Sequence, residues 1–184
     1  LMCYEKRLLP HFHFSIQSGD NLILKRMKRR HNREDVIGIC QKIKKFRKEV
    51  TFGADLIVGF PTEKEINFNN TLELVKRCLL SNVHIFPYSP REKTPASKMP
   101  QIDENIKRKR VAELRSVCRE VLSKLLQAKN GKKIKVLFES TKLSYTDDFF
   151  KVKIKNDTNR ELKKGEIIEV EILDNNENFL KAIV

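Results

Sequence analysis

Three stretches of this sequence place small or polar residues directly after an apolar run. They read SIQSGD, VGFPTE and FPYSPREKTPA and span residues 15–20, 58–63 and 86–96. Gln17 and Ser18 can form hydrogen bonds, Gly59 permits a close backbone approach, and the backbone amides after Pro61 open a helix whose dipole favours an anion. Each stretch alone could be ordinary loop chemistry. Their occurrence in this order indicates a ligand site assembled from all three.

The three stretches lie at the ends of predicted strands. Segment 10–20 alternates between apolar and polar residues, which predicts a strand with two unlike faces. The apolar face holds Phe12, Phe14 and Ile16, and the polar face holds His11, His13, Ser15 and Gln17. Residues 51–59 are almost wholly apolar, as in a strand that is covered on both faces, and residues 82–86 predict a third strand.

Helices are predicted between and after these strands, because apolar residues recur there at helical spacing. Their expected caps are Asp20, Asn32 with Asp35, Thr62 with Glu65, and Asp103, the last opening a long helix to about Ala128. The third helix is expected to bury Phe68, Leu72, Val75 and Leu79. Repeated strand–helix units predict an α/β domain with parallel strands and outer helices. Three strands are too few to close a barrel, so they are interpreted as part of one.

After Gly131 the apolar residues recur every second position, in short segments separated by polar turns. This pattern predicts a small all-β unit, most simply a five-stranded barrel. We therefore expect two domains, 1–130 and 131–184. Phe138 and Phe179 are expected to fill the barrel core, whereas Tyr145, Phe149 and Phe150 could stack on bases.

The net charge of the 184-residue chain is +14, and it is concentrated in two segments. Residues 25–48 hold eleven basic and two acidic residues, residues 91–133 hold thirteen and five, and residues 134–184 hold nine and ten. A basic balance of this size favours a polyanionic partner such as nucleic acid, although a solvated basic surface would look the same. No apolar stretch approaches the ~20 residues that span a bilayer. We expect a cytoplasmic protein without a membrane partner.

The four cysteines are Cys3, Cys40, Cys78 and Cys118, and their spacing supports no local metal cluster. The last three fall on apolar helix faces, where a buried free thiol is expected. His11 and His13 share one strand face and could bind a metal ion, but the sequence offers no carboxylate or thiolate beside them. The sequence therefore predicts no metal site.

The wording of three segments resembles the radical S-adenosylmethionine methylthiotransferases, enzymes that add a methylthio group to tRNA bases or to a ribosomal protein. These segments read HFHFSIQSGDNLILKRMKRRH, FGADLIVGFPTE and FPYSPREKTPASKMP. The resemblance extends over essentially the whole chain and includes a C-terminal unit similar to the RNA-binding TRAM barrel. The segment LKRMKRRH and the weakly basic, short barrel look most like the branch that acts on threonylcarbamoyladenosine beside the anticodon.

The resemblance implies a cofactor site. Ser15, Gln17 and Ser18 would line the S-adenosylmethionine pocket, and the guanidinium of Arg29 would pair with the methionine carboxylate. The second strand would lie against the nucleoside. A wider pattern of radical enzymes reads G-x-I-x-G-x-x-E there.

Within that pattern Asp55 replaces the first glycine and Gly59 matches the second. Glu63 stands one place later than the expected acid. The predicted contact with the nucleoside therefore depends more on Gly59 and the backbone than on Glu63.

The resemblance also implies contacts with RNA. Tyr88, Ser89 and Arg91 would face substrate or cofactor from the third loop. The segments KRMKRR (25–30) and KRKR (107–110), the latter with Lys107 and Arg108, could bind phosphates or form solvated helix faces. Tyr145 and Phe149 are the expected base-stacking residues of the barrel.

The family builds its chemistry on an iron–sulfur cluster held by a C-x-x-x-C-x-x-C loop, and on a second cluster in an N-terminal domain. Neither motif occurs in this sequence, which begins with Leu1 and looks like the middle of a larger protein. We therefore expect the C-terminal part of a tRNA methylthiotransferase that binds S-adenosylmethionine and tRNA and is inactive alone. Its cluster-binding half would be a separate partner if it is encoded separately.

Two alternatives remain open at the level of the sequence. One is a non-catalytic RNA-binding remnant, and the other is the branch that modifies a ribosomal protein. Truncation would also leave an unpaired strand edge and an uncovered apolar face at Phe12 and Phe14, so we expect residues 1–128 alone to be marginally stable, whereas 131–184 could fold alone.

Overall fold

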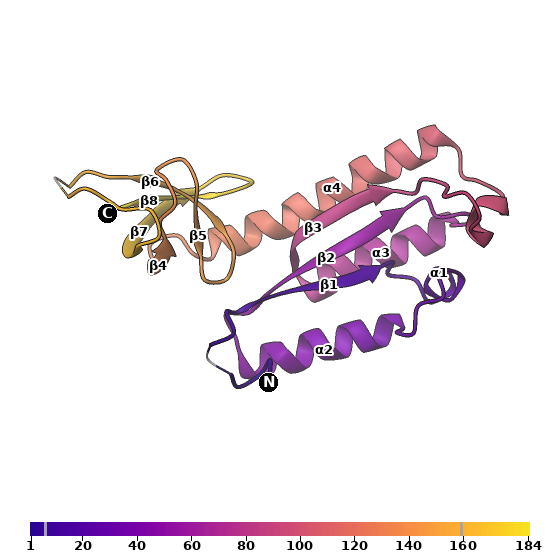
Figure 1. The fold of residues 1–184 in the computed structure, drawn as a ribbon, viewed down its shortest axis with the longest axis horizontal. Coiled ribbons are helices and arrows are strands. Elements are labelled where there is room, and N and C mark those ends of the chain that lie inside the picture. Colours follow the sequence, from indigo (N-terminus) through magenta and orange to yellow (C-terminus); the bar gives the residue numbers. More distant parts are fainter. Residues whose placement is uncertain (6, 159) are drawn as a thin grey trace.

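The computed structural model describes residues 1–5, 7–158 and 160–184. Its first part is a three-stranded parallel sheet of order β1-β2-β3, with β1 at His11–Gln17, β2 at Thr51–Val58 and β3 at Leu80–Pro87 (Figure 1). Both outer strands, β1 and β3, therefore have one edge without a strand neighbour within the described residues. No helix among the described residues is long and apolar enough to cross a membrane.

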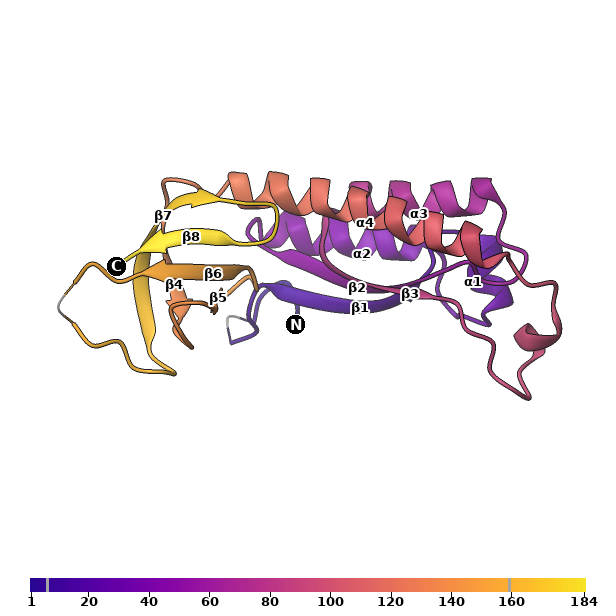
Figure 2. The same ribbon diagram turned by 90° about the horizontal axis from the view of Figure 1, so that it is seen from above.

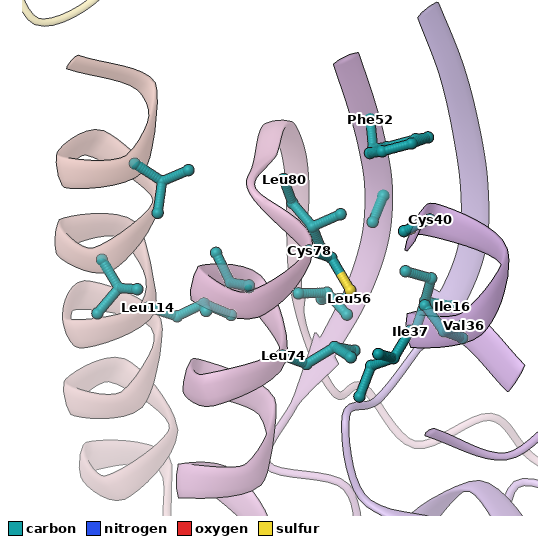
Figure 3. Close-up of a cluster of buried hydrophobic side chains, with 14 of the residues drawn as sticks. Ile16, Val36, Ile37, Cys40, Phe52, Leu56, Leu74, Cys78, Leu80 and Leu114 are labelled. Carbon is teal, nitrogen blue, oxygen red and sulfur yellow. The ribbon is translucent and has the colours of Figure 1, made fainter. Parts of the chain in front are cut away.

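Three helices cover one face of this sheet. They are α2 (Arg33–Phe46), α3 (Glu65–Cys78) and α4 (Glu104–Gln127), and Figure 2 shows them together on one side, with the short α1 (Asn21–Arg26) near the carboxyl end of β1. The core between sheet and helices includes Ile16, Phe52, Leu56, Leu74 and Leu114 (Figure 3). The predicted mixture of parallel strands and outer helices is confirmed.

The sheet face that stays open is the polar one. Phe12 and Phe14 are half-buried against the helical core, so the expectation of an uncovered apolar face at these residues is wrong. The pleat directs His11, His13 and Ser15 to the opposite face, away from the helices. What truncation would expose here is therefore a polar surface and an unpaired edge.

The predicted caps agree with the structure at three helices. Asp20 caps α1, Asn32 and Asp35 form a capping box at α2, and Asp103 caps α4. The predicted Thr62–Glu65 box is wrong, because α3 begins at Glu65 after Lys64, whose backbone N–H donates to the Asn67 side chain.

Thr62 itself adopts a left-handed conformation with φ of 68°. Its hydroxyl contacts Arg26 and the Pro61 carbonyl instead of a helix amide. The predicted apolar face of α3 is confirmed at Phe68, Leu72 and Val75 and is wrong at Leu79. Leu74 and Cys78 are buried with Phe68 and Val75, whereas Leu79 is the left-handed C-cap and is exposed.

The second part is a closed five-stranded barrel of order β4-β5-β6-β8-β7. Its strands are β4 (Lys133–Leu137), β5 (Ser144–Thr146), β6 (Lys151–Lys155), β7 (Ile167–Asn175) and β8 (Leu180–Ile183), and a 3-10 helix, η1 (Pro95–Lys98), lies in the loop before α4. Phe138 is buried in the barrel core as predicted. Phe150 is buried there too and is not available to bases, whereas Phe179 is only half-buried under the Lys153 ammonium.

Helix α4 contributes to both cores. Val121 packs in the core beneath the sheet, and Leu126, one turn later, is fully buried in the barrel core. A fragment of residues 131–184 would therefore lack Leu126, a central side chain of the barrel core, which weighs against the expectation that it folds alone. Removing a buried leucine typically costs about 2–5 kcal/mol.

Gly59 is required by the packing of α4 against the end of β2. Its φ is +74°, and a Cβ atom at this position would lie 2.5 Å from Cγ of Lys107. The space that a side chain would occupy is thus filled by Lys107. At Gly59 the structure shows a close approach by helix α4 through the Lys107 side chain.

We expect Gly59→Ala to lower the free energy of unfolding by more than about 1 kcal/mol, because the variant combines a strained backbone with a clash. Gly38→Ala is the matched control, since Gly38 lies in α2 with nothing within 4 Å of its added Cβ, and alanine favours helix there by about 0.5–1 kcal/mol. Urea unfolding of both variants measures the difference. A Gly59→Ala variant as stable as the parent chain would contradict the packing argument.

Candidate cofactor and RNA site

The open sheet face and the carboxyl ends of the strands hold most of the predicted ligand residues. Ser15 is exposed on β1 and accepts a hydrogen bond of 2.8 Å from the Gln17 amide. Asp55 lies on the same face of β2, half-buried beside His13 and His84. This grouping was not predicted from the sequence, because His84 belongs to a strand that was identified only by its apolar residues.

A cavity of about 320 Å³ lies where the strands end. Gln17 and Arg29 line it, together with Arg26 and Lys28 from the α1 segment and with residues 94–96 of the loop after β3. Phe60 of the second stretch lines it too, so all three predicted ligand stretches meet in one cavity. Its cationic side chains suit a carboxylate or a phosphate group.

The turn after β1 gives two predicted residues different surroundings. Gln17 ends the strand in a left-handed conformation with φ of 74°, and its side chain faces the cavity. Ser18 is buried, and its hydroxyl accepts a hydrogen bond of 3.2 Å from the Asp20 amide. Ser18 thus shapes the turn into α1 and does not line the cavity.

Glu63 is buried on the helical side of the sheet. Its carboxylate accepts a 3.0 Å hydrogen bond from the Gly59 N–H and forms a 2.9 Å ion pair with Arg110 of α4. Burial raises the pKa of Glu63, and the Gly59 N–H and the Arg110 charge oppose this shift. Its carboxylate is 1% exposed, so its partners are within the protein.

Of the three residues predicted in the loop after β3, Tyr88 packs against the protein, whereas Ser89 and Arg91 face solvent. The Tyr88 ring packs edge-on against Phe60 and lies 5.8 Å below the Lys107 ammonium, and its buried hydroxyl has no hydrogen-bond partner among the described residues. Ser89 and Arg91 are exposed. Only these two of the three are placed to meet a macromolecule from this loop.

The two basic residues predicted on α4 also differ. Lys107 is 2% exposed because its aliphatic side chain packs over Gly59. Its ammonium group forms an ion pair with Glu104 at 2.7 Å. Arg108 is exposed on the neighbouring position of the helix. The burial of Lys107 removes the physical basis for its predicted phosphate contact, and Arg108 keeps it.

The barrel turn that carries Phe149 docks against the sheet. The Phe149 ring stacks on His11 at 4.8 Å and on Tyr145 at 5.2 Å, and the Thr51 hydroxyl donates to the Asp148 carbonyl at 2.7 Å. Tyr145 and Phe149 also line a largely apolar groove of about 590 Å³ on the barrel. Tyr145 and Phe149, the predicted stacking residues, therefore form a stack of three rings with His11, and this stack lies beside the groove.

The cysteines do not converge on a metal-binding site. Cys40 and Cys78 are buried between α2 and α3, and their mutual hydrogen bond, followed by burial, raises the pKa of the Cys40 thiol. Burial raises the pKa of Cys118 to about 12. Thiolate ligands for an iron–sulfur cluster need several cysteines at one place, and the described residues contain no such group.

Comparison with known proteins relates this architecture to one superfamily. A family model described as the Radical SAM superfamily matches residues 4–75. The chain is 43% identical over 184 residues to the threonylcarbamoyladenosine tRNA methylthiotransferase MtaB of Rickettsia prowazekii, covering all of this chain and 43% of that protein.

Other matches agree with this relation. The chain is 34% identical over 187 residues to the tRNA-2-methylthio-N(6)-dimethylallyladenosine synthase of Ehrlichia canis, covering 98% of this chain and 42% of that protein. The solved structure of coproporphyrinogen III oxidase (HemN) from Escherichia coli, a radical SAM enzyme, overlaps with a TM-score of 0.51 at 16% identity, over 61% of this chain and 27% of that one. The chain thus spans roughly two fifths of the length of these curated relatives.

We expect Arg110→Met to lower the free energy of unfolding by about 3–5 kcal/mol, because it leaves the Glu63 carboxylate buried without its partner. Arg108→Met is the matched control on the exposed side of the same helix, where a change within about 0.5 kcal/mol is expected. Chemical denaturation of both variants provides the measurement. Equal stability of the two variants would show that the Glu63–Arg110 pair does not hold this end of the sheet.

Proposed function

Because this chain belongs to the radical SAM superfamily as a homologue of tRNA methylthiotransferases, we propose that it forms the C-terminal part of an enzyme that adds a methylthio group to threonylcarbamoyladenosine beside the anticodon. The observation that carries this proposal is the 43% identity to a protein of that name over the whole chain, against 34% over 187 residues to the dimethylallyladenosine enzyme of Ehrlichia canis and 38% over a shorter stretch of 135 residues to that of Orientia tsutsugamushi. The matched residues span the segments that form the sheet, the basic cavity and the barrel.

The basic cavity at the strand ends is the proposed wall of the S-adenosylmethionine site. Arg29 would pair with the methionine carboxylate, and Gln17 and Ser15 would offer hydrogen bonds from β1. In this family the iron–sulfur cluster supplies the electron that cleaves the cofactor. The cysteines of this chain do not fit such a cluster, so we assign its ligands to a segment or chain outside the present one.

The RNA surface is proposed to combine charged and aromatic groups. Arg91 and Arg108 would contact phosphates, and Tyr145 and Phe149 would present the groove of the barrel to unpaired bases. We propose residues 131–184 as a TRAM-like barrel and residues 1–130 as the later part of the radical barrel. Such an enzyme would act on tRNA in the cytoplasm.

A second candidate function is RNA binding without catalysis. The separation of the four cysteines between the N-terminal segment, α2, α3 and α4 favours it, since the chain alone cannot hold the cluster. In that case the basic cavity would bind RNA phosphate, and S-adenosylmethionine would have no preferred place. The experiments below separate the two.

Arg29→Ala is expected to weaken S-adenosylmethionine binding about tenfold or more, because a charge-assisted hydrogen bond to a carboxylate contributes about 1.5–3 kcal/mol. Arg30→Ala is the matched control, since Arg30 is exposed beside Arg29 but does not line the cavity. Calorimetric titration of the chain and both variants measures the affinities. Equal loss in both variants, or no heat of binding to the parent chain, would reject the assigned cofactor wall.

The proposed substrate is tested by deleting the gene in its native organism. Mass spectrometry of tRNA nucleosides is expected to show loss of the methylthio group from threonylcarbamoyladenosine and retention of the unmethylthiolated nucleoside. Methylthio-dimethylallyladenosine should persist, which serves as the internal control. Unchanged methylthio-nucleosides would reject the tRNA-modifying role and leave RNA binding or a protein substrate.

A further inference from the structure

His13, Asp55 and His84 form a compact cluster on the open sheet face. The Asp55 Oδ1 atom lies 3.1 Å from Nε2 of His13 and 3.2 Å from Nδ1 of His84. One ligand atom from each residue lies within 4.8 Å of the other two, and no other such group of histidine, cysteine or acidic residues occurs in the described part of the chain. Each residue comes from a different strand, so the sheet register creates the cluster.

The register explains how the three side chains meet. Asp55 and His84 are direct cross-strand partners on β2 and β3, whereas His13 is paired with Gly53 on β2. A Cβ atom on Gly53 would lie 2.4 Å from Nδ1 of His13. The imidazole of His13 therefore lies over the backbone of Gly53 and reaches toward Asp55. Any side chain at position 53 would clash with this ring, so the position of His13 depends on Gly53.

The two distances from Asp55 to the histidine nitrogens are compatible with ligands of one metal ion. Zinc–nitrogen and zinc–oxygen bonds of about 2.0–2.1 Å in a tetrahedron place neighbouring ligand atoms about 3.3 Å apart. The two distances to Asp55, 3.1 and 3.2 Å, are close to this value. Two imidazoles and one carboxylate are also a ligand set that first-row divalent ions commonly use.

The exposure of the cluster indicates an accessible site and not a closed structural one. The side chains of His13 and Asp55 are 30% exposed, and that of His84 is 57% exposed. Three protein ligands on an open face leave at least one coordination position for water or for a group of a bound molecule. The ligands are nitrogen and oxygen atoms only, which distinguishes this site from one built for an iron–sulfur cluster.

We propose that His13, Asp55 and His84 bind one divalent first-row transition metal ion, such as Zn²⁺ or Co²⁺, with an open coordination position on the polar face of the sheet. The site is separate from the basic cavity that we assign to S-adenosylmethionine, which none of the three residues lines. The proposal therefore does not rest on the cofactor assignment. It also assigns a role to His13, which the sequence left without a carboxylate partner.

The test is a titration of the untagged, metal-free chain with Co²⁺, followed by visible absorption, and with Zn²⁺, followed by calorimetry. We expect one ion per chain and the d–d bands of nitrogen- and oxygen-bound Co²⁺, without thiolate charge-transfer bands. His13→Gln, Asp55→Asn and His84→Gln should each weaken binding at least tenfold. Circular dichroism and thermal melting check that the three variants keep the fold.

His11→Gln is the matched control. His11 lies on the same face of β1 but is engaged with the Thr51 hydroxyl at 2.7 Å and with the Phe149 ring, so its loss should leave the metal affinity unchanged. Three outcomes would overturn the proposal. They are no binding by the parent chain, which would leave a hydrogen-bonded triad only, thiolate bands from cysteine ligands, or equal affinity in the parent and all three cluster variants.

Discussion

The carboxylate of Glu63 is buried between the turn after β2 and helix α4, and the carboxyl edge of the sheet is arranged around it. The Glu63 carboxylate accepts a hydrogen bond from the Gly59 N–H and forms an ion pair with the Arg110 guanidinium. A buried charge that loses its partner is strongly destabilising, so this pair fixes the exit of β2 against the helix. Lys107, one turn before Arg110, then fills the space over Gly59. Ile57 and Phe60, on either side of this exit, line the cavity at the strand ends.

The same helix sets the place of the barrel. Val121 and Leu126 bury into different cores, so α4 couples the two parts through its packing. On the other side of the barrel, the Thr51–Asp148 hydrogen bond and the stack of His11 on Phe149 attach it to the start of the sheet. Two attachments at separate points restrict rotation of the barrel. The groove lined by Tyr145 therefore keeps a defined relation to the polar sheet face.

Local sequence signals predicted the strands, most caps and the closed barrel, because these features depend on periodicity and on short-range hydrogen bonds. They failed at Thr62, where a left-handed turn displaced the helix start, and at Lys107, whose burial depends on a glycine far away in sequence. The His13–Asp55–His84 cluster could not be predicted because strand register brings its members together. Of the cavity residues, Gln17 was predictable from its place at a strand end, whereas Arg29 was predictable only through the family resemblance.

The polarity of the uncovered face constrains what can lie opposite it. Parallel sheets are ordinarily covered on both faces, and the interior of a closed α/β barrel is ordinarily packed with branched apolar residues. Here the second face carries His13, Ser15, Asp55 and His84, while the apolar side chains of β1 pack toward the helices. A hydrophobic layer against such a face would bury these polar groups at a cost of several kcal/mol unless each found a partner. The part of the face around His13, Asp55 and His84 is therefore suited to water, an ion or a polar ligand, and the exposed Phe86 ring beside His84 adds an apolar contact at its edge.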